Sequence, residues 1–195
     1  MLFSDTTLYI LAGGKGRRLG GVVKALEPVG GVPLARPLVE LREHFAGVAV
    51  VGPRGVGLDA LGVPVVEDLV VGRGAPGGLA TALEHAGTPW ICALACDMPT
   101  VTVEALQALY ALREGAEAVV ARVGDRLHPL HAFYSKAAAR RCGELATEGR
   151  SLHALLKALR TVELDLEAHA GSVTNVNTPE ELAAIRMMKG PGAEA

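Results

Sequence analysis

The sequence predicts an α/β fold in which a mostly parallel, Rossmann-like sheet is covered by helices on both faces. Several short segments are apolar without interruption, as in strands that are buried on both faces. Segments with apolar residues at helical spacing alternate with these runs. Glycine-rich or acidic segments follow several of the runs, and parallel sheets bind their ligands where the strands end.

The apolar runs define the strands in chain order. The first run ends in glycines, and the fourth, WICALA, ends two residues before an acidic residue. Both are short enough for strands, and both are rich in the residues that buried strands favour. We therefore expect strands at residues 7–12, 48–51, 63–66, 90–95, 118–122 and 161–166, and shorter ones at 24–29 and 130–134.

Helical spacing defines the second set of elements. Leu34, Leu38, Leu41 and Phe45 would lie on one side of a helix. Thr178 is a suitable N-cap for the last helix, because proline follows it and a glutamate lies three residues later. We expect helices at residues 33–45, 79–85, 103–113, 136–146, 152–159 and from 178 to about 188. A second glycine-rich loop, GRGAPGG at 72–78, is expected directly before the helix at 79–85.

Composition indicates one globular domain. The chain has 195 residues, half of them apolar, which suits a single domain over residues 1–189 with a frayed tail at 190–195. The net charge of −2 gives no basic surface for nucleic acid or for a membrane. Neither a secretory signal nor a membrane-spanning run is present, so we expect a cytoplasmic protein.

The first candidate binding element is the loop GGKGRRLGG at residues 13–21, directly after the first strand. Its glycines allow backbone N–H groups to approach anionic oxygens, and Lys15, Arg17 and Arg18 add three cations. A triphosphate is bound by that combination. The loop is neither a Walker A motif nor a complete dinucleotide fingerprint, and a solvated turn remains the alternative.

Two carboxylates are expected at the carboxyl ends of buried strands. Asp68 follows the strand at 63–66 and Asp97 follows the strand at 90–95. Mg²⁺ binds to one or two protein carboxylates together with substrate phosphates and water. A helix cap or a turn is the alternative role for each aspartate, and a surface position is the alternative for Lys24.

Five motifs in order give the chain a resemblance to the molybdenum cofactor guanylyltransferases, which are relatives of the sugar-phosphate nucleotidyltransferases. They are LAGGKGRRLGG at 11–21 with Lys24, VVED at 65–68, CDMP at 96–99, HP at 128–129 and NVNTPEEL at 175–182. The last is the most specific, because it contains both asparagines of the chain. The resemblance implies the nucleotide-diphospho-sugar transferase fold.

The resemblance also implies a reaction between GTP and the molybdopterin cofactor, with Mg²⁺ bound at Asp97. Cofactor-insertion proteins and acceptor molybdoenzymes would be further partners. The candidate catalytic residues are Lys15, Arg18, Lys24 and Asp97. The GTP site would comprise Leu11, Ala12, Gly13, Gly14, Lys24, Asp68 and Asp97, and the pterin side His128, Asn175 and Asn177. His131 has either a pterin contact or a structural role.

Some positions depart from the family pattern. Val23 stands where the family often has aspartate, and Gly52 where asparagine is sometimes found. The usual Gly-Pro-Leu-Ala-Gly run appears here as GAPGGLA. A cytidylyltransferase of the same superfamily is an alternative, although its first loop usually reads Ala-Ala-Gly where this chain has Ala12-Gly13-Gly14. A non-catalytic module that binds nucleotide or delivers cofactor is the alternative from another class.

Overall fold

A seven-stranded sheet forms the centre of the molecule in a computed structural model that describes residues 1–13, 23–29, 31–70, 72–176 and 181. The strand order is β5-β4-β1-β6-β8-β7-β9. All neighbouring strands in it are parallel except where β8 meets β6 and β7. The strands are β1 (Phe3–Leu11), β4 (Phe45–Val51), β5 (Val65–Val66), β6 (Trp90–Ala95), β7 (Ala118–Val123), β8 (Arg126–Ser135) and β9 (Thr161–Asp165).

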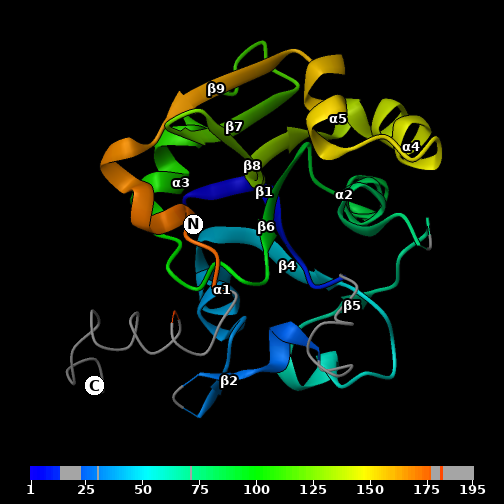
Figure 1. The fold of residues 1–195 in the computed structure, drawn as a ribbon, viewed down its shortest axis with the longest axis vertical. Helices are drawn as coiled ribbons and strands as arrows, with labels where there is room; N and C mark the ends of the chain where they lie inside the picture. Colours follow the sequence, from blue (N-terminus) through cyan, green and yellow to red (C-terminus); the bar gives the residue numbers. More distant parts are fainter. Residues whose placement is uncertain (14–22, 30, 71, 177–180, 182–195) are drawn as a thin grey trace.

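Helices cover both faces of this sheet, as the sequence predicted (Figure 1). Five α-helices are described: α1 (Arg36–Glu40), α2 (Gly74–His85), α3 (Val103–Tyr110), α4 (Ala139–Thr147) and α5 (Leu152–Ala158). Short 3-10 helices lie between them: η2 (Lys24–Leu26), η3 (Leu41–His44), η4 (Leu58–Leu61), η5 (Lys136–Ala138) and η6 (Glu167–Val173). A separate hairpin pairs β2 (Pro28–Val29) with β3 (Val32–Pro33).

The two faces of the sheet bury two separate apolar clusters. Alternate residues of β6 point to opposite faces, so Cys92 and Leu94 join one cluster while Ile91 and Ala93 join the other. Helices α1 and α3 complete the first cluster, and α2, α4 and α5 complete the second. The continuous apolar run of β6 is therefore explained by burial on both sides.

The predicted helix at 33–45 is wrong at both ends. Pro33 pairs within the β2–β3 hairpin, and the helical part consists of α1 followed by η3. Phe45 begins β4, because its ring packs 4.6 Å from that of Phe3 and the two residues pair across β1 and β4. The expected strand at 24–29 is likewise a 3-10 turn, η2, followed by the two residues of β2.

The second glycine-rich segment is part of a helix and is not the loop that the sequence predicted. Helix α2 begins at Gly74, five residues before the predicted start. Gly77 and Gly78 are buried in its first turns, and a Cβ atom on Gly77 would lie 2.7 Å from the carbonyl oxygen of Val70. The glycines therefore let the helix pack directly against the backbone that follows β5.

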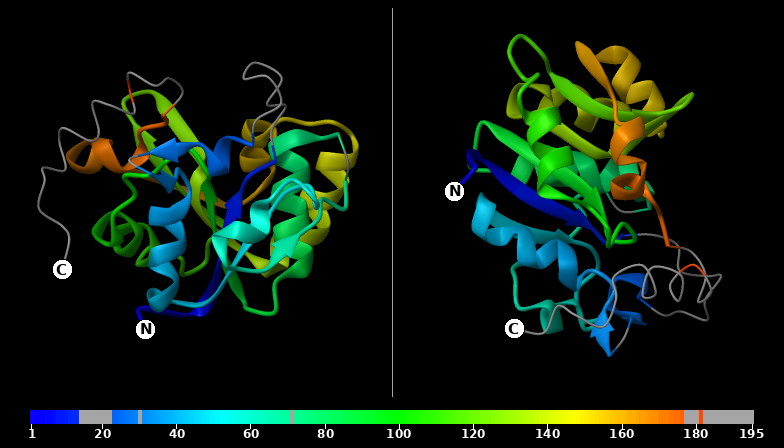
Figure 2. Two further views of the ribbon diagram at one scale, coloured as in Figure 1. Left: turned by 90° about the horizontal axis from the view of Figure 1, so that it is seen from below. Right: turned by 90° about the vertical axis from the view of Figure 1, so that its left-hand side faces the viewer.

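Figure 2 shows which segments gather at the carboxyl ends of the strands. In its left view β1 runs upward from the N-terminus, and the blue segment at 23–29 lies at the top beside the orange segment that ends at 176. The predicted last helix and the tail lie outside the described residues, apart from Glu181. Among the helices of the described part, none is both long and apolar enough to cross a membrane.

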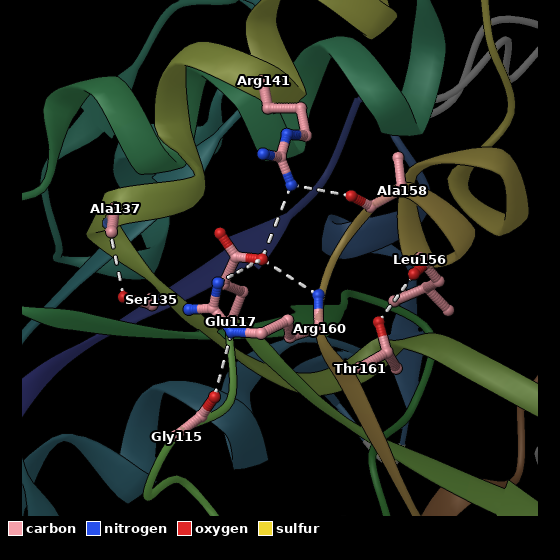
Figure 3. A network of polar contacts seen from close by, with 9 residues as sticks. All are labelled: Gly115, Glu117, Ser135, Ala137, Arg141, Leu156, Ala158, Arg160 and Thr161. Carbon is pink, nitrogen blue, oxygen red and sulfur yellow. Dashed lines mark hydrogen bonds and ion pairs between the residues drawn. The ribbon is translucent and has the colours of Figure 1, made fainter.

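A network around Glu117 joins three elements at the opposite, amino-terminal end of β7 (Figure 3). The buried Glu117 carboxylate accepts a hydrogen bond of 2.9 Å from the backbone N–H of Arg160, just before β9. The guanidinium groups of Arg160 and of Arg141, in α4, each lie 3.5 Å from the same oxygen. The carboxylate thereby fixes β9 and α4 to the start of β7.

We predict that Glu117→Ala destabilises the protein by about 2 kcal/mol, because it leaves a backbone N–H and two cations without their acceptor. The melting temperature should fall by roughly 4–8 °C in a calorimetric scan. Arg140→Ala is the matched control, since it removes an exposed ion pair with Glu144 and should cost less than about 0.5 kcal/mol. Equal effects of the two substitutions would contradict the prediction.

Candidate active site

Asp97 lies at the centre of the candidate site, two residues beyond the carboxyl end of β6. The backbone turns directly after this strand, where the N–H of Met98 donates to the carbonyl of Ala95 at 3.2 Å. The side chain of Asp97 is 15% exposed, so it is largely but not completely shielded from solvent. A single, oriented carboxylate at this end of a parallel sheet is suited to bind a cationic ligand.

Lys24 approaches Asp97 from a segment 73 residues away in the chain. Its ammonium nitrogen lies 2.7 Å from Oδ2 of Asp97, within a charged hydrogen bond. The next residue, Ala25, is fully buried, and its carbonyl accepts the N–H of Ala35 at 3.0 Å. The backbone on which Lys24 stands is therefore anchored in the core.

Asn175 contacts the other oxygen of the same carboxylate. Its Nδ2 donates to Oδ1 of Asp97 at 3.0 Å, and the N–H of Val176 donates to the Asp97 carbonyl at 2.8 Å. An asparagine suits this position because its amide nitrogen can donate to a carboxylate, whereas an aspartate would repel it. The motif at 175–182 is thus joined to the CDMP motif by direct bonds.

Further hydrogen bonds hold the chain around Asn175 against the loop after Asp97. The Thr100 hydroxyl donates to the carbonyl of Gly171 at 2.6 Å. The N–H of Thr102 donates to the Ser172 hydroxyl at 3.1 Å, and Ser172 is buried. Residues 171–176 and 97–102 therefore form one bonded unit. The sequence does not indicate the roles of the Thr100 and Ser172 side chains, because isolated serines and threonines carry no distinctive signal.

Asp68 occupies a second, neighbouring position at the end of β5. A Cβ atom on Gly13 would lie 3.1 Å from its Oδ2, and one on Gly78 would lie 3.5 Å from its Oδ1. The carboxylate therefore sits between the first glycine after β1 and the first turns of α2. Larger residues at either glycine would crowd it.

The environment of Asp68 leaves it ready to accept hydrogen bonds. Its Oδ1 is buried and has no hydrogen-bond partner within the described residues. Burial raises the pKa of this carboxyl above its ordinary value. An N–H or O–H group of a ligand would satisfy the oxygen and offset the cost of burying it.

The expected nucleotide loop is described only at its beginning. The N–H of Ala12 donates to the Val51 carbonyl at 2.8 Å, and the carbonyl of Leu11 accepts the N–H of Cys96 at 3.2 Å. These bonds fix the end of β1 between β4 and β6. Gly14, Lys15, Arg17 and Arg18 lie outside the described residues, as does Asn177, so their roles stay predictions.

His128 and His131 lie on one face of β8, although a spacing of three would put them on opposite faces of a regular strand. The pairing of β7 with β8 shifts between Val120 and Ala121, so that His128 pairs with Ala121. His131 pairs with Leu94 of β6. Both partners belong to the cluster that α1 and α3 cover, and this bulge therefore brings the two imidazoles onto that face.

Both imidazoles are buried and favour the neutral form. Burial lowers the pKa of His131 from 6.5 to about 3, with a smaller contribution from His128. Burial and then the charge of Arg126 lower the pKa of His128. Neither ring nitrogen of His131 has a hydrogen-bond partner in the described part of the chain. The pterin-side role of His128 stays a prediction, and a neutral ring would serve it through hydrogen bonds and not through charge.

Comparison with known proteins assigns the sequence to one family. A family profile described as "MobA-like NTP transferase domain" matches residues 8–163. A probable molybdenum cofactor guanylyltransferase of Pelotomaculum thermopropionicum is 35% identical over 94% of this chain and 93% of its own. The chain belongs to this family. It is therefore a nucleotidyltransferase, and the resemblance seen in the sequence is confirmed.

Solved structures agree with the fold of the family. The molybdopterin-guanine dinucleotide biosynthesis protein A from Archaeoglobus fulgidus aligns with a TM-score of 0.80 and 26% identity, over 95% of this chain and all of that one. The 2-C-methyl-D-erythritol 4-phosphate cytidylyltransferase from Thermus thermophilus has a TM-score of 0.70 over 97% and 99% of the two chains. Its 18% identity shows a shared fold alone.

A metal at Asp97 would need most of its ligands from a substrate. Within the described residues, no group of three or more histidine, cysteine, aspartate or glutamate side chains could hold a metal ion. Mg²⁺ fits such a site, because it commonly binds one protein carboxylate together with phosphate oxygens and waters. The donor set at Asp97 is therefore compatible with a magnesium–nucleotide complex.

We predict that stability falls as the pH decreases from about 6.5 toward 3, because unfolded His131 takes up a proton in this window and the folded residue does not. The slope for this one group is at most about 1.4 kcal/mol per pH unit. Urea unfolding of the wild type and His131→Leu at pH 7, 6 and 5 measures it. The variant should show a shallower dependence.

The comparison of the wild type with His131→Leu isolates His131, because Asp68 is present in both proteins. The raised pKa of Asp68 has the opposite effect on the pH dependence of stability, and this effect is the same in both. His153→Leu, at an exposed position of α5, is the control and should keep the wild-type slope. Identical slopes for the wild type and His131→Leu would show that His131 does not resist protonation in the folded protein.

Proposed function

We propose that this protein transfers GMP from GTP to the terminal phosphate of the molybdopterin cofactor, giving molybdopterin guanine dinucleotide and pyrophosphate. The observation that carries the proposal is the joint contact of Lys24 and Asn175 with Asp97. In the family's pattern Lys24 contacts the nucleotide, Asn175 faces the acceptor and Asp97 binds the metal. Their convergence gives the two substrates a common point at which to meet.

The proposed reaction joins two phosphates. An oxygen of the pterin phosphate forms a bond with the α-phosphorus of GTP, and the bond from that phosphorus to the bridging oxygen of pyrophosphate breaks. A phosphate monoester has a second pKa near 6, so the attacking group is already largely dianionic at neutral pH. The reaction therefore needs no general base, and both buried histidines can remain neutral.

The task of the protein is to hold two anions together and to balance the charge on the leaving pyrophosphate. Lys24 would pair with phosphate oxygens, and Asp68 would accept hydrogen bonds from the nucleoside part of GTP. Mg²⁺ bound at Asp97 would supply positive charge beside the phosphates. Such positioning and electrostatic stabilisation account for most of the catalysis in phosphoryl-type transfers.

We expect Asp97→Asn to lower the rate of pyrophosphate release by at least about a hundredfold, because it removes the negative charge that a hard cation needs. The shape of the side chain is retained, so a circular dichroism melt should still show a folded protein, although loss of the ion pair with Lys24 lowers its stability. Asp165→Asn, at an exposed position of β9, is the matched control and should keep full activity. Near-normal activity of folded Asp97→Asn would refute the assignment and favour Asp68 as the metal ligand.

A cytidylyltransferase of the same superfamily is the alternative, and the fold shared with the enzyme from Thermus thermophilus does not separate the two activities. We expect the purified protein with Mg²⁺ to bind GTP more tightly than CTP or ATP in equilibrium titrations. Binding of CTP at least as tight as that of GTP would remove the guanylyl assignment while keeping a nucleotidyltransferase. Binding of GTP without any turnover of the pterin would favour a delivery module.

A further inference from the structure

The carboxylate of Asp97 already has a cationic partner in the absence of any ligand. Oδ2 lies 2.7 Å from the ammonium nitrogen of Lys24, and Oδ1 accepts the amide of Asn175 at 3.0 Å. The side chains of Lys24 and Asp97 are 25% and 15% exposed, so water screens this pair less than it screens a surface pair. The two contacts differ in kind, because only the lysine neutralises the negative charge.

We propose that Lys24 is the internal counter-ion of Asp97 and keeps this carboxylate from binding a divalent cation until nucleotide phosphates draw the ammonium group away. The proposal rests on the proposed function for the identity of the metal ligand. It adds an order of events, in which the nucleotide enables metal binding by removing a competing cation. Lys24 would therefore act on the Asp97 carboxylate before it contacts the substrate.

The competition follows from the chemistry of the two cations. A divalent metal ion binds a carboxylate through its oxygen lone pairs and depends on its negative charge. The ammonium group of Lys24, at 2.7 Å, occupies a lone pair of Oδ2 and neutralises the charge of the carboxylate. A metal ion must therefore displace the ammonium group or bind to a nearly neutral pair. The Asn175 amide leaves lone pairs on Oδ1 and adds no charge, so it orients the carboxylate without competing.

The exchange would take place in the side chain of Lys24, because its backbone is anchored. Ala25 is fully buried and its carbonyl is bonded to the N–H of Ala35, so the backbone beside Lys24 stays in place. The long side chain of Lys24 can rotate from the carboxylate toward phosphates that approach the end of β1. Because coupling between two ligands is reciprocal, metal binding at Asp97 must in turn favour the contact between Lys24 and the nucleotide.

The test measures metal binding without nucleotide and without turnover. Manganese(II) is the probe, and electron paramagnetic resonance of the free ion gives its affinity for the full chain. We expect Lys24→Met to bind Mn²⁺ about tenfold more tightly than the wild type, a factor within the usual range for coupled sites. Addition of GTP should then increase Mn²⁺ affinity less in this variant than in the wild type.

Three variants separate the proposed competition from other effects. Lys24→Arg keeps the charge and should bind Mn²⁺ as weakly as the wild type. Asn175→Ala removes the neutral donor and should give no gain, and Lys157→Met, at an exposed lysine of α5, is the matched control for the substitution itself. A circular dichroism melt checks each fold, and Lys24→Gln replaces Lys24→Met if the latter unfolds.

The outcomes distinguish this inference from the proposed function. If Lys24→Met, or its replacement, binds Mn²⁺ alone no more tightly than the wild type, Lys24 is not the counter-ion of Asp97. This conclusion would hold even if the protein carries out guanylyl transfer. The last variant combines Asp97→Asn with Lys24→Met, and this double variant should lose the increase in Mn²⁺ affinity. If the gain persists in that double variant, the metal binds elsewhere and the metal assignment of the proposed function fails as well.

Discussion

The Asp97 carboxylate joins three parts of the chain that the sheet alone would leave separate. Strand β6 delivers the residue, the short η2 helix delivers Lys24, and the segment after η6 delivers Asn175. Each oxygen of the carboxylate has one of these partners, so the geometry of the site depends on bonds across more than 70 residues of sequence. Loss of the carboxylate would remove the side-chain contacts with Lys24 and Asn175, whereas the backbone bond from Val176 to Asp97 would remain.

Much of this arrangement could be predicted because strand ends and motifs are local properties. Continuous apolar runs give the strands, and the residues that follow them must lie at the carboxyl edge of a parallel sheet. Asp68 and Asp97 were placed there by that rule alone. The scarcity of asparagine makes the motif that contains Asn175 distinctive in the sequence, and the structure places this residue against Asp97.

Other features depend on packing that the sequence does not display. Helix α2 begins at Gly74 because Gly77 and Gly78 allow close contact with neighbouring backbone, whereas glycine propensity alone indicates a loop. The predicted helix at 33–45 gave way to β3, α1 and η3, since Phe45 is drawn into β4 by its contact with Phe3. In both cases long-range contacts overrode local preference.

Because of the bulge in β8, the number of residues between His128 and His131 determines how the two side chains share a face of the sheet. Side chains alternate along a strand, so two residues three apart share a face only where the pairing is irregular, whereas deletion of one residue at 129 or 130 would leave an even spacing that needs no bulge. Two relatives with the same histidines but a one-residue gap here would therefore differ in whether β8 needs the bulge to keep both imidazoles on one face. Length in this stretch carries as much information as residue identity.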